Sequence, residues 1–152
     1  MVNIIALNER ELDKICIYRI WFGNKFYIGA TLDSYKRLIQ HIASIDGCFN
    51  GKRVGKNSIT NIVNHLKDNP FIETAFFELL EECETEIDIV DAEHEWLYVE
   101  KGNPNCLNQN FNVHRTINGI IVRPNGSFAI KQNNKYVPVS YTHLTLPTSD
   151  LV

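Results

Sequence analysis

The sequence predicts an α+β fold: a small three-stranded antiparallel sheet flanked by helices, followed by a short β-rich C-terminal appendage. Two apolar runs separated by a Gly-Asn turn predict a β-hairpin over residues 14–29. Apolar residues at helical spacing then follow, first over residues 35–45 and again over residues 59–66. After Phe111 the composition shifts towards Asn, Gly and basic residues, which indicates a separate segment.

The predicted hairpin begins with residues 14–22, which are rich in β-branched and aromatic side chains. Gly23 and Asn24 form the expected turn, and residues 25–29 pair back as the second strand. A third strand is expected over residues 71–81, where apolar and polar side chains alternate. Residues 1–13 are expected to form a lead-in turn or a short helix.

Three helices are expected between and after these strands. Thr31 or Asp33 can cap the first, which is expected to end at Asp46-Gly47. Ser58 caps the second, and Asp68-Asn69-Pro70 ends it. The third begins at Thr85 and stops at Gly102-Asn103-Pro104.

Composition favours a cytoplasmic protein with one domain and an appendage. The chain has 152 residues, of which 44% are hydrophobic and 22% charged, as in ordinary globular proteins. No apolar run approaches the ~18 residues of a membrane span, so no membrane partner is expected. The N-terminus lacks the basic segment and apolar core of a signal peptide. The four cysteines show no metal-ligand spacing and are expected to be reduced thiols.

The net charge of −3 conceals a strong polarisation along the chain. Residues 14–67 carry nine Lys or Arg against two acids, whereas residues 73–100 carry eleven acids and no Lys or Arg. Residues 112–138 carry four basic residues and no acid. Basic segments of this kind suit a polyanion such as DNA, although a solvated surface with local charge bias gives the same pattern.

The strongest concentration of polar chemistry lies on the hairpin and the helix after it. Tyr18 and Tyr27 lie on the two strands, while Arg37 and His41 are four residues apart and share a helix face. Each of these residues alone is an ordinary sheet tyrosine or helix side chain. The order of strand, turn, strand and capped helix places two phenols, a guanidinium and an imidazole within reach of one another.

These residues resemble the signature of the GIY-YIG nuclease family. The motif pair is present as Cys16-Ile17-Tyr18 and Tyr27-Ile28-Gly29, with Cys16 in place of the first Gly. Arg37 and His41 follow Tyr27 at the family's ten- and fourteen-residue steps. The segment Glu95-Trp96-Leu97 is similar to the family's metal-binding helix, and Asn108 to its closing Asn. The resemblance covers residues 14–111, which we expect to form the nuclease domain.

The resemblance implies a metal-dependent DNA endonuclease, of the homing type found in phages or mobile elements. Glu95 would bind Mg²⁺, or another divalent cation such as Mn²⁺, and Arg37 would hold phosphate oxygens. Tyr18, Tyr27 and His41 are the candidates for activating the attacking water, and the choice among them stays open. Asn108 would fix the geometry of the site. The alternative is a catalytically inactive DNA-binding domain.

Residues 112–138 resemble the start of an ethylene-response-factor-type (apetala) DNA-binding domain. Three short strand signals, over residues 120–123, 127–131 and 135–137, are joined by Asn-rich turns. The resemblance implies DNA contacts from Arg123, Lys131 and Lys135. Residues 139–152 resemble the conceptual translation of a transposase-type sequencing adapter, and we expect them to be a disordered artefact.

Overall fold

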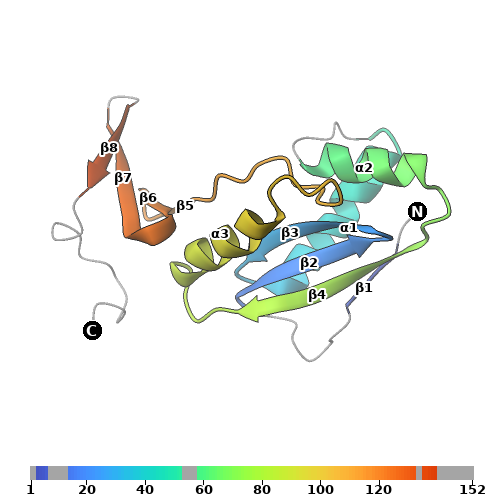
Figure 1. Cartoon of the computed structure of the whole chain (residues 1–152), viewed down its shortest axis with the longest axis horizontal. Helices are drawn as coiled ribbons and strands as arrows, with labels where there is room; N and C mark the ends of the chain where they lie inside the picture. Colours follow the sequence, from blue (N-terminus) through green and yellow to red (C-terminus); the bar gives the residue numbers. More distant parts are fainter. Residues whose placement is uncertain (1–2, 7–13, 53–57, 133–134, 140–152) are drawn as a thin grey trace. The chain divides into compact units, whose positions relative to one another are not determined.

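The computed structural model describes residues 3–6, 14–52, 58–132 and 135–139. The chain forms two compact units, which divide between Asn112 and Val113 (Figure 1). The α+β class predicted from the sequence is confirmed. No helix in the described part of the chain has the length and apolar character that a membrane span requires.

The first unit is built on a four-stranded sheet in the order β1-β4-β2-β3. Its central strands pair antiparallel, as predicted: β2 (Cys16–Phe22) lies between β3 (Lys25–Thr31) and β4 (Thr74–Glu82). The fourth strand is β1 (Asn3–Ala6), which pairs parallel to β4. The expectation of a turn or helix over residues 1–13 is therefore corrected for residues 3–6. The two adjacent isoleucines of this strand favour an extended backbone.

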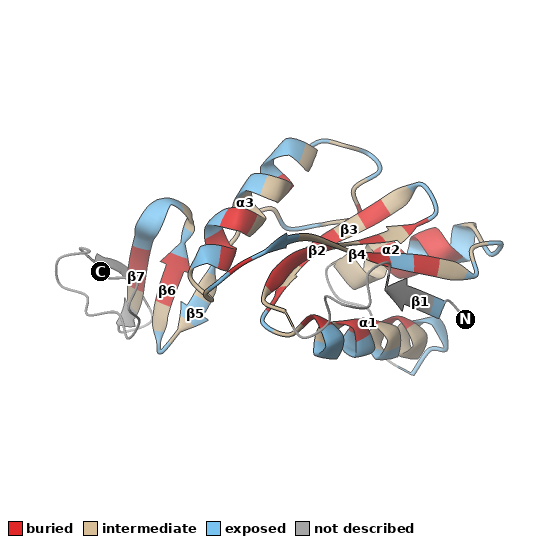
Figure 2. Cartoon of the chain, turned by 90° about the horizontal axis from the view of Figure 1, so that it is seen from below, coloured by how far each residue is buried: buried red, intermediate tan, exposed pale blue. Residues whose placement is uncertain are grey.

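Helices cover both faces of this sheet. On one face Tyr18, Ile20 and Phe22 pack in a common core with buried residues of α1 (Ser34–Phe49) and α2 (Ser58–Asp68). The other face is covered by α3 (Asp88–Glu100), which contacts β2 and β3. Figure 2 shows α1 and α3 on opposite sides of the sheet. The alternation of side chains along β2 thus divides the strand between two separate helical layers.

The limits of α1 show how local chemistry sets its ends. The Asp33 carboxylate caps the N-terminus by accepting a hydrogen bond from the Lys36 amide at 3.1 Å. The expected end at Asp46-Gly47 is corrected, because the helix continues through Gly47 to Phe49. Gly51 has a positive φ of 72°, a conformation that glycine adopts at little cost, and the chain leaves the helix there. The start and end predicted for α2 agree with the structure.

The second unit contains a four-stranded antiparallel sheet in the order β5-β6-β7-β8. The strands are β5 (Arg115–Ile117), β6 (Ile120–Arg123), β7 (Ser127–Gln132) and β8 (Lys135–Val139). The 3₁₀ turn η2 (Pro124–Gly126) joins the middle pair. The three predicted strands are present, and β5 adds a fourth through the turn at Asn118-Gly119. Val139 closes β8, and the rest of the expected artefact lies outside the described residues.

The cap of α1 leads to a test of its stability. Asp33→Ala should lower the free energy of unfolding by about 1 kcal/mol, because the Lys36 amide loses its acceptor. Asp33→Asn is the matched control, since its side-chain oxygen retains the capping geometry. Urea unfolding followed by circular dichroism measures both, and equal losses for the two variants would contradict the capping role.

Candidate functional site

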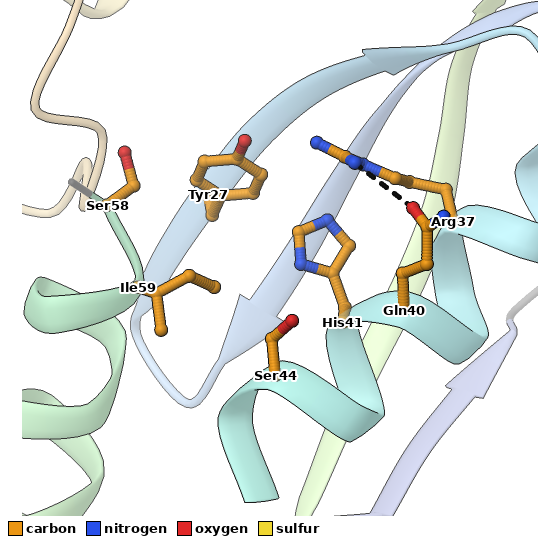
Figure 3. Close-up of a pocket in the computed structure, with 7 residues that line it drawn as sticks. All are labelled: Tyr27, Arg37, Gln40, His41, Ser44, Ser58 and Ile59. Atoms are coloured by element: carbon orange, nitrogen blue, oxygen red, sulfur yellow. Dashed lines mark hydrogen bonds between the residues drawn. The ribbon is translucent and has the colours of Figure 1, made fainter. Parts of the chain in front are cut away.

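The candidate site is a cavity of about 210 Å³ between β3, α1 and the start of α2. Its lining is mostly polar and comprises Tyr27, Arg37, Gln40, His41, Ser44, Ser58 and Ile59. Figure 3 shows the Tyr27 ring, the Arg37 guanidinium and the His41 ring lying around one space. Of the residues expected from the sequence, three therefore line a single cavity.

Tyr18 does not line this cavity, but its hydroxyl contacts two residues that do, Arg37 and His41. The side chain is fully buried and stacks on Phe77, with ring centroids 4.8 Å apart. Its hydroxyl oxygen lies 2.7 Å from His41 Nε2 and accepts a hydrogen bond from Arg37 Nε at 3.2 Å. Because Arg37 can only donate, the hydroxyl hydrogen is available to His41. The Tyr18 and Tyr27 rings are neighbours, with their centroids 6.3 Å apart.

The protonation states of the site follow from burial and from the Arg37 charge. Desolvation, reinforced by Arg37, lowers the pKa of His41 to about 3. Desolvation also raises the pKa of Tyr18 well above its usual value and raises that of Tyr27. The nearby phenol of Tyr18 raises the pKa of Arg37. At neutral pH the site therefore holds two protonated phenols, a neutral imidazole and a guanidinium cation.

Gly29 is required for Tyr18 to occupy this position. The two residues are directly paired across β2 and β3. A Cβ atom at Gly29 would contact the Tyr18 hydroxyl and lie 2.5 Å from its Cζ. The absence of a side chain at residue 29 thus creates the space in which the phenol meets His41 and Arg37.

Asn108 fixes the backbone between Tyr27 and Gly29. Its Oδ1 accepts a hydrogen bond from the Ile28 amide at 2.9 Å, and its Nδ2 donates to the Ile28 carbonyl at 2.7 Å. The amide and the carbonyl of Ile28, at the edge of the sheet, are therefore both hydrogen-bonded to one side chain. Asn108 is not among the residues that line the cavity, so its contact with the site runs through the backbone of β3.

The two candidate carboxylates of α3 differ in where they point. Glu95 is exposed on α3. Glu93 lies four residues after buried Ile89 and four before buried Leu97, on the face that packs against the sheet. Two residues along a helix correspond to a rotation of about 200°, so the two carboxylates point in nearly opposite directions. The negative charge of Glu93 raises the pKa of both Tyr18 and Tyr27.

Sequence reasoning could have selected Glu93. Its spacing to Ile89 and Leu97 places it on the apolar stripe of the helix, which is an unusual position for a carboxylate. Cys16, which replaces the first Gly of the expected motif, is fully buried in the core with Tyr18. A small apolar thiol is accommodated there because its neighbours are also core side chains.

The described residues contain no group of three or more His, Cys, Asp or Glu side chains that could hold a metal ion. A site for a divalent cation would therefore rest on a single carboxylate, with water completing the coordination. Mg²⁺ commonly binds in this way, because it dehydrates reluctantly. Glu93 is the carboxylate that fits this requirement, since its charge acts on the residues of the cavity.

The three basic residues expected to bind DNA in the second unit do not share one face of the sheet. Arg123 pairs with Ser127, and Lys131 lies four residues further along the same strand, so these two positions lie on one face. Lys135 pairs with Gln132 and occupies a position on the opposite face. The side chain of Arg123 is exposed.

Comparison with known proteins identifies no relative: no family model, curated protein or solved structure matches the chain.

The packing of Tyr18 on Gly29 predicts a coupled loss of stability. Gly29→Ala should cost about 1–3 kcal/mol of unfolding free energy, because the new methyl group displaces the phenol. In a Tyr18→Ala background the same substitution should cost much less, since the ring is absent. Denaturant unfolding of the four proteins in this cycle measures the coupling. Equal costs in both backgrounds would show that the contact is not the cause.

The neutral state of His41 predicts a pH dependence of stability. Between pH 6.5 and about pH 3 the unfolded chain binds a proton at His41 and the folded chain does not. The contribution of this residue is therefore fully present above pH 6.5 and is lost as the pH falls towards 3. Urea unfolding at several pH values should show a shallower decline for His41→Gln than for the parent. An unchanged slope would contradict a neutral buried imidazole.

Proposed function

We propose that the chain is a metal-dependent DNA endonuclease of the GIY-YIG type, which hydrolyses phosphodiester bonds. The observation that carries this proposal is the hydrogen-bonded group of Tyr18, Arg37 and His41 beneath a cavity that Tyr27 lines. Phosphodiester hydrolysis needs a base for the attacking water and a cation for the charge that develops on phosphate. This group supplies both within one hydrogen-bonded unit.

Arg37 is the group suited to the phosphate. Its Nε is bonded to Tyr18 and its Nη1 to Gln40 at 3.2 Å, which fixes the plane of the guanidinium beside the cavity (Figure 3). The remaining N–H groups of the fork are left for phosphate oxygens. Because the guanidinium keeps its charge at all physiological pH values, this interaction strengthens as negative charge builds up during attack.

Tyr27 and His41 are the candidates for taking the proton of the attacking water. Both line the cavity, whereas Tyr18 is fully buried. The Tyr18 hydroxyl lies 2.7 Å from His41 Nε2 and accepts a hydrogen bond from Arg37, so it positions these two groups beside the cavity. Because the pKa of His41 is about 3, its imidazole is a weak base. The proton transfer therefore depends on a bound cation, which would lower the pKa of the water.

Glu93 replaces Glu95 as our candidate for the metal ligand. A bound Mg²⁺ or Mn²⁺ would lower the pKa of its water and stabilise the leaving oxygen. The basic segments of the chain favour DNA as the partner. We further propose a homing type of endonuclease, from a phage or mobile element, acting in the cytoplasm.

The second unit is proposed to add DNA affinity through the face that carries Arg123 and the Lys131 position. These positions lie on neighbouring antiparallel strands, and a sheet of this size can enter the major groove. Lys135, at a position on the other face, is no longer included among the proposed contacts.

Substitution of the two carboxylates of α3 tests the proposal. Glu93→Gln should reduce Mg²⁺-dependent cleavage of plasmid DNA at least a hundredfold, because the neutral amide cannot replace a charged metal ligand. Glu95→Gln, two residues along the same helix, is the matched control and should retain activity within about twofold. Single-turnover cleavage at protein excess and low salt measures both variants.

Three results would overturn parts of this proposal. No cleavage by the parent with Mg²⁺ or Mn²⁺ would reject the nuclease function, and binding without cleavage would favour the inactive DNA-binding alternative. Loss of activity in Glu95→Gln but not in Glu93→Gln would indicate that Glu95, not Glu93, is the metal ligand.

A further inference from the structure

A second polar cavity, of about 540 Å³, lies further along α2 from the candidate site. Its volume falls within the range of small-molecule binding sites. We call it the carboxamide pocket, and the lining residues used below are Asn24, Lys25, Asn61, Asn64, His65 and Asp68. They come from the turn between β2 and β3 and from one side of α2, so the pocket lies wholly within the first unit.

Part of this lining is fixed by hydrogen bonds within the protein. Asn61 Nδ2 donates to the Leu107 carbonyl at 3.0 Å, and Asn61 Oδ1 accepts from Gln109. His65 is buried, and its Nε2 lies 2.8 Å from the Phe22 carbonyl oxygen while its Nδ1 contacts Asn69. These side chains have little hydrogen-bonding capacity left for a ligand. They form rigid walls that hold the shape of the cavity.

Four further lining side chains have no hydrogen-bond partner among the described residues. They are those of Asn24, Lys25, Asn64 and Asp68. Lys25 and Asp68 border the same space without forming an ion pair with each other. The cavity therefore presents an ammonium group, a carboxylate and two carboxamides. Such a set offers hydrogen-bond donors and acceptors together, as the edges of nucleobases require. A Lys can donate to the acceptors of guanine, an Asn can form two hydrogen bonds with adenine, and an Asp can accept one from the amino group of cytosine.

Both α2 and β3 contribute residues to the carboxamide pocket and to the candidate site, so the spacing of those residues fixes the distance between the two cavities. Ser58 in the first cavity and Asn61, His65 and Asp68 in the second share one face of α2, because they follow at steps of three or four residues. Asn64 is about 9 Å along the helix axis from Ser58. On β3, Lys25 and Tyr27 lie on the same face, about 7 Å apart. At 3.4 Å for each nucleotide, these spans correspond to about two or three nucleotides.

We propose that the carboxamide pocket binds a nucleobase of the DNA strand, two or three nucleotides from the phosphate held at Arg37. This inference rests on the proposed nuclease function and adds a specificity-determining subsite to it. The phosphate contacts of Arg37 carry no sequence information, whereas contacts to a base edge do. The pocket would therefore select which phosphate of the strand reaches the cavity lined by Tyr27.

The test uses the full chain and an abasic scan. Cleavage of plasmid DNA with Mg²⁺ first maps a cut site. Binding of the corresponding duplex is then measured by fluorescence anisotropy in EDTA, with one base removed at a time. Removal of the base two or three nucleotides from the cut, on one side only, should weaken binding about five- to tenfold. Asn64→Ala should weaken binding to the intact duplex by a similar factor and should abolish the effect of that abasic position.

Matched controls separate this effect from general loss of affinity. Asn105→Ala removes an exposed carboxamide that does not line the pocket, and Lys67→Ala removes an exposed charge of α2 that does not line it either. Both should keep the abasic effect. Cleavage by the parent with a flat abasic scan, or an Asn64→Ala variant that behaves like Asn105→Ala, would overturn the subsite and leave the nuclease function standing. A parent that cuts no DNA would overturn both.

Discussion

The buried hydroxyl of Tyr18 is the constraint on which the candidate site depends. A phenol at 0% exposure must find partners, because an unpaired hydroxyl in a core costs about 1–3 kcal/mol. His41 and Arg37, both from α1, provide those partners, while Gly29 on the neighbouring strand leaves the ring its space. The helix, the hairpin and the polar group are thus fixed by one side chain. The burial that forces this hydroxyl to find partners also keeps the phenol protonated and, together with the Arg37 charge, keeps the imidazole neutral.

The charge distribution acquires a physical meaning once the fold is known. The basic half of the chain supplies the hairpin, α1 and α2, which surround the candidate cavity, whereas the acids are concentrated on β4 and α3. Most of these acids are exposed, but Glu93 lies on the face of α3 that packs against the sheet. Its charge acts on two tyrosines that lie near a guanidinium. Under the proposed function this carboxylate would hold the divalent ion, so the acidity of the helix is compatible with a polyanionic substrate.

Much of the fold was predictable because local signals agree with tertiary packing. The hairpin of residues 14–29, the start of α2 at Ser58 and the capping of α1 by Asp33 all follow from patterns that the structure satisfies. The parallel strand β1 was not predictable, since a four-residue strand depends on pairing with β4, which follows more than sixty residues later. The sequence motif selected Glu95, but the motif alone does not show which carboxylate of α3 faces the sheet. Helical phase, set by the buried Ile89 and Leu97, places Glu93 on that face.

The hydrogen bonds of Asn108 explain how an edge strand can carry a residue of the candidate site. β3 is the last strand of its sheet, and its outer backbone groups would otherwise face solvent beside Tyr27. The side chain of Asn108 occupies both hydrogen-bonding groups of Ile28, and the neighbouring backbone bonds of Asn105 and Leu107 to Phe26 extend this pairing. The strand edge is therefore closed by a short segment that also supplies a wall of the carboxamide pocket. Because one segment closes the edge, positions Tyr27 and borders the second cavity, a displacement of residues 105–108 would disturb both cavities together.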